Sequence, residues 1–180
     1  MPWPEPLPRR GSRTVLRRLA AGDLDAFQAY RHDAEVQRYQ GWQPLQDSDA
    51  LAFIEEMATA PLFRRGQWVQ IGIADTRDGA LIGDIGICIS ADGGSAEIGF
   101  TIGPRSQGRG LGTEAVGQVI RLLFECTAAA RIVGVTDSRN SASIRLLERV
   151  GMRRVATRHT VFNAEPCIEH TYAVSRHDGG

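Results

Sequence analysis

The segment Gln107-Gly-Arg-Gly-Leu-Gly112 decides the fold of this 180-residue chain. Its three glycines alternate, and it stands between a stretch typical of a β-strand and one typical of an amphipathic helix. Glycine permits positive φ angles and a close approach of the backbone to a ligand. The amides at the start of the following helix would point at one spot, where the helix dipole adds partial positive charge. We therefore expect a site for phosphate or pyrophosphate, with Arg109 and Arg105 as further positive charges.

Other interpretations of this loop can be compared with its context. A Rossmann site needs Gly-x-Gly-x-x-Gly in an early βαβ unit, whereas this loop reads Gly-x-Gly-x-Gly and follows residue 100. A Walker-A loop needs a lysine, and all 21 basic residues of the chain are arginine. A tight turn from strand to helix, without any ligand, is the alternative to an anion site.

Upstream of the loop, apolar residues alternate with polar ones in stretches separated by turn sequences. Asp78-Gly79 is a strong hairpin signal, and Ala91-Asp-Gly-Gly94 supplies the next turn. The centre of the chain is therefore predicted to be an antiparallel meander. The whole pattern predicts one α/β domain with a mixed, mostly antiparallel sheet flanked by helices. In chain order, the predicted elements are a strand at 14–19, a helix with Asp23 as its N-cap, a helix capped by Asp47 or Ser48, strands at 68–74, 81–90 and 95–102, a helix after 112, a strand at 131–136, a helix from 139 to 151, and strands at 155–162 and 167–174.

The two ends of the chain differ from the rest. Residues 1–12 are rich in proline, so we expect an extended N-terminal arm and no signal peptide. Trp3 and Leu7 are candidates to hold the arm on the domain or on a partner subunit, and the alternative is a free end. Residues 13–175 are expected to form the domain, and residues 176–180 a flexible tail.

The composition argues against several classes of protein. Hydrophobic residues make up 42% of the chain and charged residues 23%, as in an ordinary globular protein. Basic and acidic residues number 21 each, which argues against nucleic-acid binding, and no apolar run is long enough to span a membrane. The three cysteines form no CxxC pair and the histidines show no i,i+4 spacing. We therefore expect no metal site, free thiols and a cytoplasmic location.

Four motifs, in order along the chain, resemble those of the GCN5-related N-acetyltransferases, the GNAT superfamily. Gln107-x-x-Gly110-x-Gly112 resembles the acyl-CoA-binding signature of that superfamily. The resemblance covers residues 13 to 175 or thereabouts. The other three motifs are similar to the branch typified by the RimJ/RimL ribosomal-protein N-acetyltransferases: Ala96-Glu-Ile-Gly-Phe100, Asp137-Ser-Arg-Asn-Ser-Ala-Ser143 and Leu146-Leu-Glu-Arg-Val-Gly-Met152.

The resemblance implies a single-domain GNAT fold whose sheet is splayed between its fourth and fifth strands. In this chain those strands are Ser95–Ile102 and Arg131–Thr136, and a β-bulge near the end of the fourth strand is expected to open the gap. Acetyl-CoA, the implied acyl donor, would lie in the gap, with its pyrophosphate on the loop amides and its pantetheine arm along the fourth strand. The implied acyl-CoA-binding residues are Ile102, Gln107, Gly108, Arg109, Gly110, Leu111, Gly112, Thr113, Asn140 and Ser143.

The same resemblance implies roles in the acetylation of an amine, which needs a proton acceptor, a polarised thioester and a protonated leaving thiolate. Glu97 stands where this branch often carries a glutamate and is the candidate base. Its alternative is a strand glutamate that faces solvent or pairs with an arginine. Asn140 is a candidate to bind the pantetheine or thioester region and also a candidate helix N-cap. Ser143 is the candidate partner of the CoA sulfur.

The chain departs from many relatives at Leu147, where they carry a tyrosine that acts as general acid. Ser143 or a water must therefore supply the proton, or the thiolate leaves unprotonated. Tyr39 and Trp42 are candidates for the wall of the acceptor pocket, with a role in the core as their alternative.

The implied function is that of an acetyl-CoA-dependent N-acetyltransferase. The acceptor would be a primary amine, either a peptide or protein N-terminus or a small amine, which attacks the thioester directly. The alternative is a non-catalytic CoA-binding or interaction module on the same fold. A homodimer is compatible with this branch, and neither a metal, a nucleic acid nor a membrane partner is implied.

Overall fold

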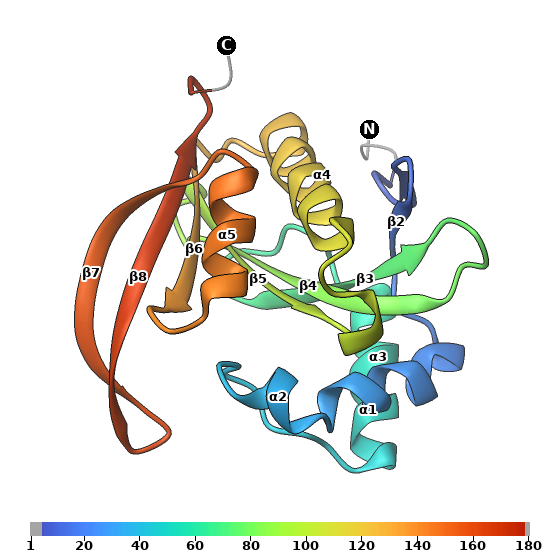
Figure 1. Ribbon diagram of the computed structural model, residues 1–180. Coiled ribbons are helices and arrows are strands. Elements are labelled where there is room, and N and C mark those ends of the chain that lie inside the picture. The colour runs from blue at the N-terminus through green and yellow to red at the C-terminus, as the bar shows by residue number, and fades with distance from the viewer. Residues whose placement is uncertain (1–4, 179–180) are drawn as a thin grey trace.

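The computed structural model describes residues 5–178, which form one eight-stranded sheet in the order β1-β2-β3-β4-β5-β6-β8-β7 (Figure 1). Neighbouring strands are antiparallel except β5 and β6, which are parallel. This confirms the predicted mixed, mostly antiparallel sheet. The strands are β1 (Arg9–Arg10), β2 (Thr14–Arg17), β3 (Trp68–Asp75), β4 (Leu81–Ile89), β5 (Ser95–Ile102), β6 (Arg131–Asp137), β7 (Arg153–Phe162) and β8 (Glu165–Ser175).

Helices cover both faces of the sheet (Figure 1). In this view α1, α2 and α3 lie below the sheet, and α4 and α5 lie above it. The order of the main elements agrees with the prediction, and the short β1, the single-turn α2 and two 3-10 turns are additions. The helices are α1 (Leu24–Arg31), α2 (Ala34–Gln37), α3 (Asp47–Thr59), α4 (Leu111–Cys126) and α5 (Ser141–Arg149), and the 3-10 turns are η1 (Ala21–Asp23) and η2 (Pro104–Ser106).

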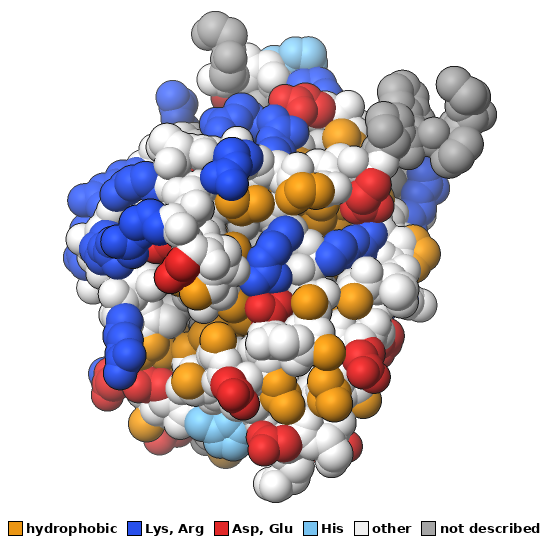
Figure 2. All heavy atoms as spheres, turned by 90° about the vertical axis from the view of Figure 1, so that its right-hand side faces the viewer, with side chains coloured by type: hydrophobic (Ala, Val, Ile, Leu, Met, Phe, Trp, Pro, Cys, Tyr) orange, Lys and Arg blue, Asp and Glu red, His pale blue; other side chains and the backbone are white. Residues whose placement is uncertain are grey.

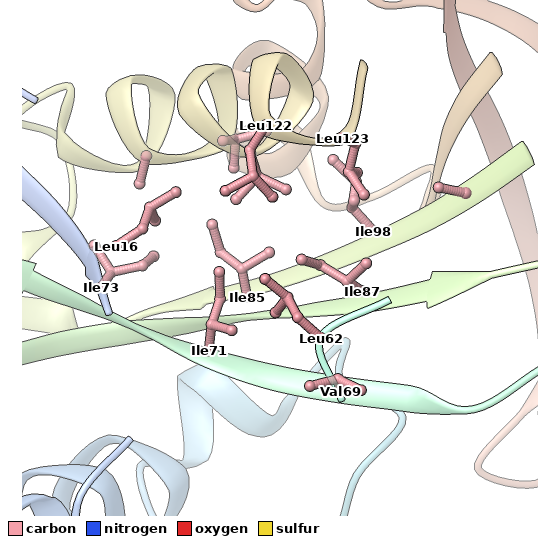
Figure 3. Close-up of a cluster of buried hydrophobic side chains, with 14 of the residues drawn as sticks. Leu16, Leu62, Val69, Ile71, Ile73, Ile85, Ile87, Ile98, Leu122 and Leu123 are labelled. Carbon is pink, nitrogen blue, oxygen red and sulfur yellow. The ribbon is translucent and has the colours of Figure 1, made fainter. Parts of the chain in front are cut away.

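The core lies between α4 and the central strands (Figure 3). Leu122 and Leu123 extend from α4 toward Ile85, Ile87 and Ile98 of the sheet, and all five side chains are at most 2% exposed. Full burial of one such side chain contributes about 1.5–3 kcal/mol to folding. This packing holds α4 across β4 and β5, so that the helix begins beside the end of β5.

The sheet splays between β5 and β6, which are the fourth and fifth strands of the prediction because the two-residue β1 precedes them. The two strands pair only from Ser95–Ile98 to Arg131–Gly134, although both continue for several residues beyond. The predicted splay is therefore confirmed.

The β-bulge expected near the end of β5 is not the cause of this splay. The pairing of β5 with β4 keeps one register from Gly83 opposite Ile102 to Ile89 opposite Ala96. At the point of separation β6 packs closely against α5, since a Cβ atom on Gly134 would stand only 3.0 Å from Cδ2 of Leu147. Leu147 is 1% exposed, and Gly134 is the last residue of β6 that pairs with β5.

Two predicted helix caps are wrong in detail. Asp23 directly precedes α1, but its carboxylate accepts hydrogen bonds from Arg17 and from the N–H of Ala20, each at 2.8 Å, and does not cap the helix. α3 starts after Gln46, whose side chain makes no capping bond. The ion pair with Arg17 offers the Asp23 carboxylate a stronger partner than the neutral amides of the helix do.

The N-terminal arm packs on its own domain from Leu7 onward. Leu7 is 6% exposed and belongs to the hydrophobic core, and the following Arg9–Arg10 form β1 on the edge of β2. At the other end, Arg176 donates hydrogen bonds to backbone carbonyls of the loop before β6. Trp3 and the last two residues of the predicted tail lie outside the described residues.

Candidate functional site

The glycine loop adopts the conformation that its sequence predicts. Gly108 and Gly110 have φ angles of 70° and 76°, in the left-handed region that favours glycine. Gly110 is the N-cap of α4, and the first hydrogen bond of that helix runs from the N–H of Glu114 to Gly110 O. The N–H groups of the first turn, from Leu111 to Thr113, therefore have no partner within the helix, and they form a cradle suited to an anion.

Gln107 and Gly112 place this cradle against the end of β5. The Nε2 of Gln107 donates to Ile102 O at 2.9 Å, so the loop is tied to the last residue of the strand. A Cβ atom on Gly112 would stand 2.9 Å from Cδ1 of Leu146 and 3.1 Å from Cγ1 of Ile102. Glycine at 112 is thus needed for the close approach of α4 to both β5 and α5.

Arg13 is a basic residue that contacts this loop and that the sequence analysis did not identify. Its Nη1 donates to Arg109 O at 2.7 Å, and its Nη2 stands 2.9 Å from the position of a Cβ atom on Gly110. Arg13 therefore brings a positive charge to the cradle from the start of β2. No local motif signals it, because the two segments meet only through the packing of α4 on β2.

The C-terminal half of β5 directs backbone N–H and C=O groups into the gap between β5 and β6. Ser95 O accepts a hydrogen bond from Ser90 N on the β4 side, and successive residues of a strand point their backbone groups to alternate sides. Phe100 and Ile102 therefore direct their N–H and C=O groups toward the gap with β6. The Nε2 of Gln40 already reaches Phe100 O at 3.3 Å. A pantetheine arm has amide groups that can pair with such a strand edge.

A cavity of about 60 Å³ lies at the apex of the splay. It brings together three predicted site residues, Tyr39, Asn140 and Ser143, with the backbone of both diverging strands. Asn140 Oδ1 accepts a hydrogen bond from Ser143 N at 3.2 Å, so Asn140 caps α5. Its amide nitrogen is not used by that bond. Leu147 also lines the cavity and offers no acidic proton there.

Glu97 is not a lining residue of this cavity; it precedes the lining residues Ile98 and Gly99 and lies on the lower face of β5. Its neighbours Ala96 and Ile98 are buried on the opposite face, whereas Glu97 is half-buried. Burial raises the pKa of the Glu97 carboxyl above its usual value, and the negative charge of Glu169 on β8 raises it further. A carboxylate with a raised pKa is a better proton acceptor near neutral pH, which is the property that a general base needs.

The two aromatic residues predicted for the acceptor wall occupy different places. Tyr39 lines the cavity, while the ring of Trp42 lies over the guanidinium of Arg31, with Cζ 4.2 Å from the ring centroid. That guanidinium is buried and forms an ion pair with Asp84 at 2.8 Å. Trp42 thus packs on a structural ion pair beside the site, and the structure does not bring it into the cavity.

A second hollow, of about 330 Å³, extends from the glycine loop between α4 and α5. Thr113 of the predicted site lines it, together with Arg121 and Arg149, which the sequence reasoning missed. A signal was present for Arg121, because positions 113, 117 and 121 share one face of a helix at i,i+4 spacing. The hollow could hold a part of a ligand that extends beyond the loop and carries negative charge.

The described part of the chain, residues 5–178, contains no cluster of three or more His, Cys, Asp or Glu side chains placed to hold a metal ion. It also contains no helix that is both long and apolar enough to cross a bilayer.

The comparison with protein families agrees with this geometry. Residues 13–153 match the family described as "Acetyltransferase (GNAT) domain". This chain belongs to the GNAT acetyltransferases. Its relative YoaA of Bacillus subtilis, named as an uncharacterized N-acetyltransferase, is 29% identical over 166 residues, which cover 90% of this chain and 93% of the relative. The chain is accordingly an N-acetyltransferase by family.

Solved structures show the same GNAT fold. A GNAT-family acetyltransferase from Bacillus anthracis matches with a TM-score of 0.82 and 21% identity, over 92% of this chain and 96% of that chain. RimL, a ribosomal alpha-N-protein acetyltransferase in complex with coenzyme A, matches with a TM-score of 0.80 and 15% identity, over 93% of this chain and 97% of RimL. At such identities the likeness shows the fold, and the RimJ/RimL branch stays a prediction for this chain.

Proposed function

We propose that this GNAT chain transfers the acetyl group of acetyl-CoA to a primary amine, which attacks the thioester directly. The observation that carries the proposal is the early end of the β5–β6 ladder, at Ile98 and Gly134. Beyond it, an anion cradle lies at one end of the gap and a cavity lies at the apex, beside Glu97. This arrangement suits a ligand with a diphosphate at one end and a reactive group at the other.

The residues present fit acetyl-CoA. The free amides from Leu111 to Thr113, with Arg13 and Arg109 nearby, would bind the pyrophosphate. The backbone of Phe100 and Ile102 would pair with the pantetheine arm. The hollow beside Arg121 would take the rest of the nucleotide. The RimL structure in complex with coenzyme A shows that this fold can hold such a ligand.

Acetyl-CoA supplies an activated acyl group, and the protein supplies the proton transfers and the positioning. Glu97 accepts a proton from the attacking amine, directly or through a water, while the amide bond forms and the bond from carbonyl carbon to sulfur breaks. Ser143 lines the cavity, which supports a role for its hydroxyl in protonating the leaving thiolate. Asn140 has an amide nitrogen free to donate to the thioester carbonyl, where negative charge develops.

Calorimetry with acetyl-CoA and an assay of thiol release with a panel of amines test this proposal. Binding of acetyl-CoA, followed by amine-dependent release of CoA, is the expected result. Binding without thiol release from any amine would favour the alternative, a non-catalytic CoA-binding module. Absence of binding at millimolar acetyl-CoA would reject both.

A further inference from the structure

An exposed tryptophan stands in one row with Glu97 on the lower face of the sheet. Trp68 on β3 lies opposite Cys88 on β4, and Cys88 lies opposite Glu97 on β5. Directly opposed residues of neighbouring strands point their side chains to the same face. Neighbouring strands are about 4.8 Å apart, so the backbones of Trp68 and Glu97 are about 10 Å apart. Trp68 is 46% exposed, which is unusual for so large an apolar side chain.

The next row toward the cavity is made of glycines, Gly86 on β4 opposite Gly99 on β5. A Cβ atom on Gly86 would stand 3.0 Å from Cε3 of Trp68 and 2.8 Å from Oε1 of Gln70, so the indole lies over Gly86. A Cβ atom on Gly99 would have no heavy atom within 4 Å. We call the open space over Gly99 the acceptor trough. The indole forms one wall of this trough, and Glu97 lies on a second side.

The acceptor trough leads to the place where the thioester is proposed to react. Gly99 is also a lining residue of the apex cavity, together with Val135 on β6. An amine that lies over Gly99 can therefore reach both Glu97 and the apex. A substituent on that amine would point back toward Trp68.

The charges around the trough fit a single cation. Within residues 5–178, Glu97 forms no ion pair within 4.0 Å. Three neighbouring carboxylates on this face each pair with an arginine, so Glu97 is the carboxylate of this group that has no arginine partner in the described part of the chain. The neutralised pairs are Asp84 with Arg31 at 2.8 Å, Glu169 with Arg158 at 2.7 Å and Asp137 with Arg139 at 2.8 Å.

The layer of α1, α2 and α3, on the same side of the sheet, is acidic. Residues 20–60, which form this layer, contain eight acidic residues and two arginines. Figure 2 shows the consequence on one face of the molecule, where acidic side chains are frequent in the lower half, at the height of these helices, and arginines gather in the upper half. Such a field draws a cation toward the lower face and an anion toward the upper one.

We propose that Trp68 is a specificity residue of the acceptor site, and that the preferred acceptor carries one ammonium group beside an aromatic or other flat apolar group. The inference rests on the proposed function and names its substrate class. Glu97 takes the amine, and the exposed indole stacks on the apolar group. A polyamine would bring further ammonium groups for which the trough has no second unpaired carboxylate among the described residues, and an amino acid would bring a carboxylate beside Glu97.

Steady-state kinetics with matched amines test the inference, with acetyl-CoA saturating. The panel is 2-phenylethylamine, propylamine, spermidine and phenylalanine. We expect kcat/KM for 2-phenylethylamine to exceed that for each of the other three by about tenfold or more, chiefly through KM. Trp68→Ala should bring 2-phenylethylamine to within about twofold of propylamine, without changing propylamine itself. Trp68→Phe should keep most of the preference.

One control variant and the pattern of outcomes separate this inference from the proposed function. Val161→Ala removes an exposed apolar side chain from β7, remote from the trough, and should leave the preference unchanged. If amines are acetylated but spermidine or phenylalanine is preferred, or if Trp68→Ala lowers kcat/KM for all amines alike, the role of Trp68 is overturned and the proposed function stands. If no amine releases thiol, the proposed function fails and the inference fails with it.

Discussion

The side chain of Leu147 lies against Gly134, with Cδ2 3.0 Å from where a Cβ atom would stand, at the point where β5 and β6 separate. Gly99, one residue beyond the last paired residue of β5, has open space where its Cβ atom would be. The upper side of the splay is therefore closely packed at its apex, and the lower side is open. The two glycines offer a matched pair of substitutions that separates the proposed CoA side from the proposed acceptor side.

Gly134→Val should damage the CoA side. The new side chain collides with Leu147, and overpacking of this kind typically costs about 1–3 kcal/mol of folding stability. Displacement of Leu147 into the apex cavity should also weaken acetyl-CoA binding.

Gly99→Val should instead fold normally and keep its affinity for acetyl-CoA, while KM for the amine rises at least tenfold because the valine fills the acceptor trough. Urea denaturation, calorimetry and kinetics measure the three quantities. An unchanged amine KM in Gly99→Val would contradict the position of the acceptor trough.

Glu97→Gln tests the proposed base. The amide cannot accept the amine proton, so we expect kcat to fall about a hundredfold, within the usual range for the loss of a general base. Acetyl-CoA binding should not change, because Glu97 faces away from the glycine loop. In the wild-type protein kcat/KM should rise with pH through the raised pKa of Glu97, since the base acts in its deprotonated form. A loss of less than threefold would remove Glu97 from the base role.

Glu169→Gln should shift that pH dependence without removing the base. The negative charge of Glu169 raises the pKa of Glu97, and Glu169 is paired with Arg158 at 2.7 Å. Its neutralisation removes the repulsion and leaves the arginine uncompensated, so the pKa of Glu97 falls. The acid limb of the kcat/KM profile is expected to move to lower pH, with the plateau nearly unchanged. Glu125→Gln is the matched control, because Glu125 on α4 is also paired with an arginine, Arg9 at 2.6 Å, and lies away from the lower face. A shift to higher pH in Glu169→Gln would contradict the assignment of this limb to Glu97.

The sequence was informative where function depends on backbone geometry. The alternating glycines of 107–112 predicted a helix start with left-handed residues, and this pattern is local because it depends on neighbouring residues. The splayed pair of strands was implied by the family resemblance and not by any local pattern. The resemblance also implied roles for Asn140 and Ser143, and both side chains line the apex cavity.

The sequence was less informative where distant segments meet. Arg13 reaches the glycine loop from the residue before β2, and Trp68 reaches the acceptor trough from β3, so neither belongs to a motif that includes its partner. The expected bulge in β5 was also wrong, because β5 keeps one register with β4 along its length. Asp23 did not cap α1 because Arg17 competes for its carboxylate. These features depend on the packed sheet rather than on periodicity.

Gly110→Glu should abolish the tight binding of acetyl-CoA. Gly110 has a φ angle of 76°, and the new carboxylate would enter the anion cradle beside Arg13. We expect affinity to fall at least a hundredfold, from repulsion of the diphosphate and from strain in the left-handed backbone. Gly66→Glu is the matched control, because Gly66 has a φ angle of 69° and lies between α3 and β3. It should share the loss of stability and keep the affinity. If Gly66→Glu lost as much affinity for acetyl-CoA as Gly110→Glu, backbone strain alone would explain the loss.

Asn140 has two proposed roles that different substitutions separate. Its Oδ1 caps α5 by accepting from Ser143 N at 3.2 Å, and its amide nitrogen is proposed to donate to the thioester carbonyl. Asn140→Ala removes both and should lower the free energy of unfolding by about 1 kcal/mol, the usual value of an N-cap. Asn140→Asp keeps a capping oxygen and a charge that suits a helix N-terminus, so stability should be retained. It lacks the donor, however, and places negative charge beside a carbonyl that gains negative charge during reaction. We therefore expect kcat to fall at least tenfold in Asn140→Asp at unchanged stability. Full activity in Asn140→Asp would leave Asn140 with the capping role alone, and the stabilisation of the thioester would have to come from the backbone of the splayed strands.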